Sequence, residues 1–163
     1  MSTTFVIKPP QRHSHTRSIT DDSGMQRFEV HYGSRWRPSR RLSIRDPADT
    51  EVAVISRGAG RIHHELLAGG QRITMRPAGF NSRKLKITSA DDRLEVVGDH
   101  RSGFRPFSII RGGMPAATVT FGKESTVAIT DGEDPVLMLA LALTIASINS
   151  DLGAVQAAKP IRY

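Results

Sequence analysis

The chain of 163 residues contains no cysteine. This absence excludes a disulfide framework, a zinc site built on thiolates and a cysteine nucleophile. The sequence also lacks a glycine-rich phosphate loop followed by lysine, a nucleophile elbow and paired carboxylates in a repeated setting. We therefore predict that the protein is not an enzyme and that it needs no cofactor.

The first ten residues lack the basic start and the long apolar run that are typical of a secretory signal. We therefore expect a cytoplasmic protein, and the absence of cysteine suits a reducing compartment.

One long apolar stretch is present, at residues 134–148, and it carries no charge after Asp134. Apolar residues occur at every angle of the helix that this stretch would form, so the helix must be buried on all sides. Its length of about 22 Å is too short for the roughly 30 Å hydrocarbon core of a bilayer. Asp134 and Pro135 predict the helix start, and residues 149–153 predict its end.

From residue 26 onward, short runs alternate apolar and polar residues, which is typical of half-buried strands. These runs lie at residues 27–32, 41–45, 51–54, 61–67, 72–76, 84–88, 94–96, 107–110, 118–121 and 126–130, after a first run at 3–8. Residues 11–24 are polar, and we interpret them mostly as loop with a short edge strand near Arg17, Ser18 and Ile19. Turn-forming residues separate the runs, so neighbouring strands should pair as antiparallel hairpins.

About twelve strands with one apolar face each, followed by a helix with no polar face, favour one architecture. We predict a mainly β (α+β) fold in which a closed antiparallel barrel of about 12 strands surrounds a buried C-terminal hydrophobic helix. Residues 1–151 would form this barrel domain and residues 152–163 a short tail. We expect a monomer.

This pattern resembles the LURP-one-related family, which belongs to the tubby C-terminal-like superfamily together with the phospholipid scramblases. The segments that carry the resemblance are FEV at 28–30, LSIRD at 42–46, EVAVI at 51–55, RIHHEL at 61–66, KLKI at 84–87 and VAI at 127–129, with the apolar helix after them. Tubby proteins bind phosphoinositides through a basic face. The resemblance therefore implies a non-enzymatic module that recognises anionic phospholipid headgroups at a membrane surface. The lipid-binding residues of tubby proteins cannot be aligned with this sequence one by one, so none is carried over.

The formal charge is +7, and residues 1–113 hold 20 of the 23 Lys and Arg but only 11 of the 16 Asp and Glu. A basic surface attracts phosphate-bearing partners, either anionic lipid or nucleic acid. The densest cluster comprises Arg35, Trp36, Arg37, Arg40 and Arg41, in which Arg can pair with phosphate and Trp can rest at a lipid interface. A second cluster comprises Arg83, Lys84 and Lys86, with Arg72 and Arg76 nearby.

Three hypotheses for function stay open. The clusters bind lipid headgroups; or the chain binds nucleic acid in a transcription-associated role; or it is a partner-binding structural domain whose charge serves solubility. His63, His64 and Glu65 do not indicate a metal site, because on a strand His64 points away from the other two.

Overall fold

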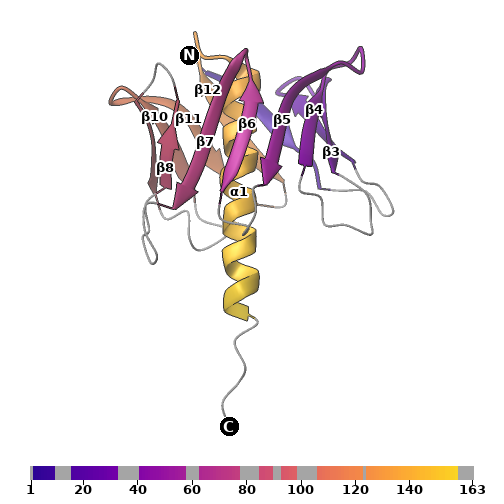
Figure 1. The fold of residues 1–163 in the computed structure, drawn as a ribbon. Helices are drawn as coiled ribbons and strands as arrows, with labels where there is room; N and C mark the ends of the chain where they lie inside the picture. The colour runs from indigo at the N-terminus through magenta and orange to yellow at the C-terminus, as the bar shows by residue number, and fades with distance from the viewer. Residues whose placement is uncertain are drawn as a thin grey trace.

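The computed structural model describes residues 2–9, 16–32, 41–57, 63–77, 85–89, 93–98, 106–122 and 124–157. Within these residues, twelve strands precede one long helix (Figure 1). The strands are β1 (Ser2–Ile7), β2 (Thr16–Asp21), β3 (Gln26–Tyr32), β4 (Arg41–Arg45), β5 (Glu51–Arg57), β6 (His64–Ala68), β7 (Gln71–Pro77), β8 (Leu85–Thr88), β9 (Leu94–Gly98), β10 (Phe107–Arg111), β11 (Met114–Thr120) and β12 (Ser125–Thr130). The helix is α1 (Pro135–Ala157).

The strands form a nearly closed antiparallel barrel. Strands that follow each other in sequence pair side by side from β1 to β8 and from β9 to β12. The first strand pairs with the last, from Ser2 opposite Thr130 to Ile7 opposite Ser125. β8 and β9 lie next to each other at the seam, but among the described residues no hydrogen-bonded ladder joins them. The fold class expected from the sequence is confirmed.

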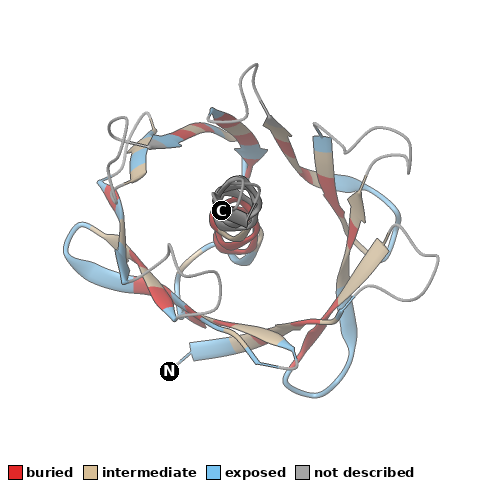
Figure 2. Cartoon of the chain, turned by 90° about the horizontal axis from the view of Figure 1, so that it is seen from below, coloured by how far each residue is buried: buried red, intermediate tan, exposed pale blue. Residues whose placement is uncertain are grey.

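The helix α1 runs inside this barrel, where its surroundings match its apolar surface. Each of the nine residues 137–145 is at most 6% exposed. Figure 2 shows the strands forming a ring around the helix. The one hydroxyl in this stretch, on Thr144, donates to the Ala140 carbonyl at 2.7 Å, so it adds no unpaired polar group to the core. Among the residues that the structure describes, no helix combines the length and apolar character that a bilayer crossing requires.

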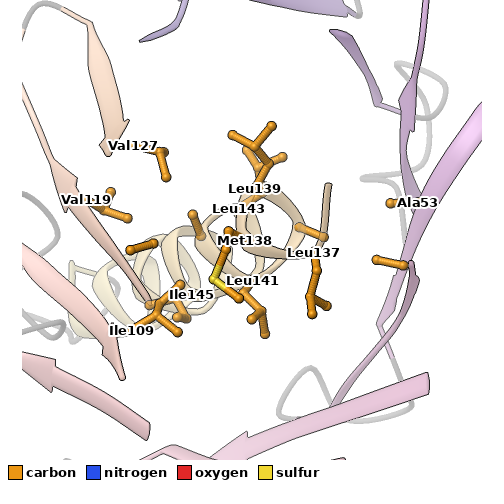
Figure 3. Packing of buried hydrophobic residues seen from close by; sticks show 14 of the residues in the cluster. Ala53, Ile109, Val119, Val127, Leu137, Met138, Leu139, Leu141, Leu143 and Ile145 are labelled. Carbon is orange, nitrogen blue, oxygen red and sulfur yellow. The ribbon is translucent and has the colours of Figure 1, made fainter. Parts of the chain in front are cut away.

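Side chains from the inner faces of the strands complete the core. Figure 3 shows the helix side chains pointing outward in several directions, with Ile109, Val119 and Val127 on one side and Ala53 on another. The helix backbone comes closest to β5, β6, β11 and β12. Three of these strands carry small buried residues, Ala53, Ala68 and Ala117. Small side chains allow the wall to approach the helix without overpacking.

The helix start is fixed by Asp134 and a glycine turn. Asp134 Oδ1 accepts a hydrogen bond from the Val136 backbone N–H at 3.0 Å, as an N-terminal cap does. The β6–β7 turn packs against the same carboxylate, because a Cβ on Gly69 would collide with Asp134 Oδ2. Gly69 also has a φ of +57°, which favours glycine. The cap predicted from the sequence is confirmed.

Two sequence-based predictions were wrong. The segment near Ser18 is not an edge strand: β2 is a six-residue strand paired on both sides, with β1 and β3. A polar segment is tolerated there because residues 16–18 stay half-exposed, while Ile19 is fully buried in the core. The helix also continues past the predicted end, to Ala157. Ala, Leu and Gln after residue 151 favour helix, and Gly153 costs only about 1 kcal/mol against them.

The alternating strand directions give the barrel two different ends. One end, here called the turn end, holds the strand ends that flank the connections at 22–25, 46–50, 69–70, 89–93, 112–113 and 131–134. The opposite end, here called the loop end, holds the strand ends that flank the connections at 8–15, 33–40, 58–63, 78–84, 99–106 and 121–124. In Figure 1 the turn end is at the top, and α1 enters there and leaves at the loop end.

We expect Leu141→Ala to lower the free energy of unfolding by about 2–5 kcal/mol, because Leu141 is fully buried and the substitution leaves a cavity. The matched control is Leu67→Ala on the outer wall, where Leu67 is 44% exposed. Chemical denaturation would measure the free energy of unfolding of both variants. Similar losses in the two variants would contradict the buried position of the helix.

We expect Gly69→Ala to destabilise the protein more than Gly70→Ala. Both glycines have positive φ, which costs an alanine about 1–2 kcal/mol, but only at Gly69 does the new Cβ meet a side chain. In an Asp134→Ala background the difference between the two variants should shrink. An unchanged difference would contradict the contact between this turn and the helix cap.

Candidate functional site

Most of the predicted site residues cannot be placed. Arg35, Trp36, Arg37, Arg40, Arg83 and Lys84 lie outside the described residues. Of the predicted set, Arg41 and Lys86 are described, and both are exposed.

Arg41 begins β4 at the loop end, and its charge is partly neutralised. Its Nη2 atom lies 2.8 Å from Oε1 of Glu51. An exposed pair of this kind contributes little to stability, typically 0–1 kcal/mol, and it is screened by salt. Arg41 is therefore available to an anion only in competition with Glu51.

Lys86 lies directly opposite another cation, Arg76, on the neighbouring strand β7. Both side chains are exposed. Like charges at directly opposed positions destabilise a sheet. Within the described part of the chain, neither residue has a carboxylate within ion-pair distance. An anion bridging the two side chains would remove this repulsion, so the Arg76–Lys86 pair is the described feature best suited to anion binding.

The other cation predicted near this cluster, Arg72, does not join it. Arg72 lies at the opposite end of β7, and its Nε is 3.3 Å from Oε1 of Glu65. Arg41 and Lys86 are also separate, because β5, β6 and β7 lie between their strands. At about 4.8 Å per strand, this separation is roughly 19 Å along the wall. The described members of the two clusters thus lie apart near the same rim.

Charge is segregated between the two ends of the barrel. The six loop-end connections, counted in the sequence with two flanking residues on each side, hold 16 Lys and Arg and 3 Asp and Glu. The six turn-end connections, counted in the same way, hold 5 Lys and Arg and 11 Asp and Glu. The strands that flank the basic segments end at the loop end and those that flank the acidic segments end at the turn end, so the net charge of +7 is the sum of two sets of segments of opposite charge.

Three ion pairs of the described residues lie at the acidic turn end. Arg27 Nε lies 2.8 Å from Asp21 Oδ2, and Arg45 Nη1 lies 3.1 Å from Asp49 Oδ1. Arg111 Nε lies 3.1 Å from both carboxylate oxygens of Glu133. Arg27, Arg45 and Arg111 are therefore paired within the protein, whereas Arg76 and Lys86 have no carboxylate partner among the described residues.

The side chain of Asp21 has several hydrogen-bond partners at the turn end. Its side chain accepts hydrogen bonds from the Ser23 hydroxyl and from the backbone N–H groups of Ser23 and Met25, and it pairs with Arg27. The Ser23 hydrogen bond and Arg27 together lower the pKa of this carboxyl from 3.8 to about 2. The charged form therefore stabilises the β2–β3 turn.

Histidines and carboxylates do not assemble a metal centre in the described part of the chain. His64 is 1% exposed and faces the core, whereas His63 is exposed and Glu65 faces outward to Arg72. The opposite orientation predicted for His64 is confirmed. No group of three or more metal-ligating side chains converges among the residues that can be described.

The observed architecture is that of a barrel threaded by a single helix, and a known structure shares it. The X-ray structure of a protein from Arabidopsis thaliana, AT5G01750, matches with a TM-score of 0.62 over 93% of this chain and 91% of that chain. The two sequences are 16% identical, so the similarity establishes the fold alone. No family model and no curated protein matches the chain.

Two features of the site were missed from the sequence. Arg76 was noted only as a sequence neighbour, because the cross-strand register that sets it opposite Lys86 cannot be read from spacing. The segregation of charge was missed as well. Counting charges over alternate connections would have found it, since an antiparallel meander sends successive connections to opposite ends.

We expect Asp21→Asn to reduce stability near neutral pH and to have less effect in acid. The folded-state pKa lies below the unfolded value of 3.8, so the stabilisation is complete above pH 4 and is lost as the pH falls toward 2. The difference in unfolding free energy between wild type and Asp21→Asn should shrink over that window in denaturant titrations. The control is Asp22→Asn, at the exposed neighbouring residue. A difference independent of pH would contradict the assignment.

Proposed function

We propose that the protein is a non-enzymatic binding module of the LURP-one-related type whose loop end recognises anionic phospholipid headgroups. It acts in the cytoplasm as a peripheral protein at the membrane surface. The observation that carries the proposal is the segregation of 16 Lys and Arg against 3 Asp and Glu at one end of the barrel.

A set of basic segments that follow strand ends at one rim suits a planar anionic surface. The strands that flank these six segments end at the same end of the barrel, so a single orientation turns all of these strand ends toward a membrane. Each Lys or Arg near an anionic bilayer contributes about 1 kcal/mol, and the field falls off within a Debye length of about 8 Å at physiological salt. The acidic turn end would be repelled by the same surface, which favours docking end-on.

The Arg76–Lys86 pair adds a local reason for anion binding. Two opposed cations without a carboxylate partner among the described residues destabilise the sheet, and a bound anion would offset this repulsion. Arg forms two parallel hydrogen bonds to phosphate, and Lys adds a flexible point charge.

The first test is co-sedimentation of the full chain with vesicles of neutral, phosphatidylserine-containing and phosphoinositide-containing composition, at low and physiological salt. Selective binding that survives physiological salt supports the proposal. If DNA or RNA competes equally well and binding falls steeply in modest salt, the result favours the nucleic-acid hypothesis and overturns the headgroup proposal.

We expect Arg76→Ser combined with Lys86→Ser to weaken vesicle binding about 30-fold, at roughly fivefold per lost charge. Arg72→Ser in the same strand is the control, because Arg72 is already paired with Glu65. A second variant replaces Arg35, Arg37, Arg40 and Arg41 by Ser and tests the other cluster. Unchanged binding in both multiple variants would contradict a headgroup site at the loop end.

A further inference from the structure

A cleft opens at the turn end, between the wall of the barrel and the start of α1. It has a volume of about 460 Å³, and the structure describes every residue that lines it. Its apolar surface comes from Phe5 on β1, Phe28 on β3, Pro47 and Pro135, with Thr3 beside them. The ring centroids of Phe5 and Phe28 are 6.1 Å apart, so the two rings form one aromatic surface. We call this feature the turn-end cleft.

The position of the helix explains why the barrel stays open on this side. The α1 backbone comes closest to β5, β6, β11 and β12, and not to β1, β2 and β3, which carry most of the cleft. Along the inner face of β1, Ile7 and Phe5 are buried, whereas Thr3, the residue nearest the turn end, is small and exposed. The core packing therefore stops short of the turn end beside these strands.

Two carboxylates lie at the turn-end cleft, and one of them is paired. Asp21 Oδ2 lies 2.8 Å from Nε of Arg27, which also lines the cleft. Asp22 is exposed, and no cation of the described residues lies within ion-pair distance of it. Asp134 already caps the positive end of the α1 dipole, so the helix adds little positive potential here. The cleft thus combines an apolar surface with an excess of negative charge.

A second hollow adjoins the turn-end cleft. It measures about 300 Å³ and shares Arg27, Phe28 and Pro47 with the cleft. Its lining is polar and contains three further carboxylates, on Glu29, Asp46 and Asp49. Together the two hollows are lined by five carboxylates and two arginines, so both are acidic. Two adjoining hollows that are open to solvent suit an extended chain, with side chains in each, better than a compact small molecule in an enclosed pocket.

We propose that the turn-end cleft binds a basic peptide segment of a partner protein, with one aromatic or aliphatic side chain of that segment against Phe5 and Phe28. Burial of this anchor side chain supplies affinity, and cations beside Asp22 and in the second hollow supply charge complementarity. The whole turn end favours a basic partner, because its segments hold 11 Asp and Glu against 5 Lys and Arg. The site lies at the end opposite the proposed membrane surface, so the two proposals stand or fall separately.

The probe is a blocked, fluorescently labelled pentapeptide, Lys-Arg-Phe-Lys-Arg, whose binding to the full chain is followed by fluorescence anisotropy. The reference peptide Lys-Arg-Ser-Lys-Arg has the same charge and no anchor. We expect the phenylalanine peptide to bind about tenfold more tightly, because its ring is buried against the aromatic surface. A third probe, phenethylammonium, carries the ring and one charge without a peptide chain, and we expect it to bind at least about tenfold more weakly than the phenylalanine peptide.

Two pairs of variants locate the site. Thr3→Trp fills the cleft without changing charge, and we expect it to remove the preference for the phenylalanine peptide. Its control is Thr4→Trp, at the neighbouring position on the other face of β1, which should leave the preference intact. Because both Thr3 and Asp22 are exposed, their variants should fold, and denaturation curves would verify this.

The second pair separates a site from general attraction to an acidic surface. We expect Asp22→Lys to weaken binding of the phenylalanine peptide about fivefold. Glu95→Lys makes the same change of charge at an exposed residue of β9, and four strands lie between β9 and β2. This control should stay within about twofold of the wild type.

Three results would overturn the inference. Equal binding of the phenylalanine and serine peptides, or equal losses in Asp22→Lys and Glu95→Lys, would mean that only general charge attraction acts at this end. Absence of binding by the phenylalanine peptide at low salt would exclude the site. Binding of phenethylammonium as tight as that of the phenylalanine peptide would exclude a peptide occupant and assign the cleft to a small organic cation.

Discussion

The structure depends on the burial of a helix that has no polar face. Nine consecutive residues of α1 are almost inaccessible, and no single sheet face could cover them from all directions. A barrel can, because each of its strands turns one apolar face inward. The same requirement explains the small residues on β5, β6 and β11 where the helix comes closest to the wall. The barrel architecture therefore follows from the need to shield α1 from solvent on all sides.

This construction leaves function to the two ends and the outer wall. In the described part of the barrel, α1 and the core side chains occupy the interior. The meander sends successive connections to opposite rims, which allows opposite charge to accumulate at the two ends. A protein with one basic end and one acidic end has a preferred orientation toward any anionic surface, even without a specific binding pocket.

Much of the fold could be predicted from the sequence, because period-two patterns and one all-apolar helix have few solutions. β2 was predicted mostly as loop, because its polar residues Thr16 and Ser18 obscure the strand pattern. Ile19 lies on the inner face of this strand. The site was harder to predict. The opposition of Arg76 and Lys86 depends on the register between β7 and β8, which the sequence spacing does not reveal. Sequence clusters such as residues 35–41 indicate where charge is dense but not which charges lack partners.

The most direct test of the account is hydrogen–deuterium exchange of the full chain with and without anionic vesicles, followed along the backbone. We expect slower exchange at loop-end positions such as Tyr32, Arg41 and Lys86, and unchanged exchange at the turn-end residues Ser23, Gly69 and Gly112. Slowing confined to the turn end, or vesicle binding with no change at the loop end, would contradict the claim that one end of the barrel is the binding surface.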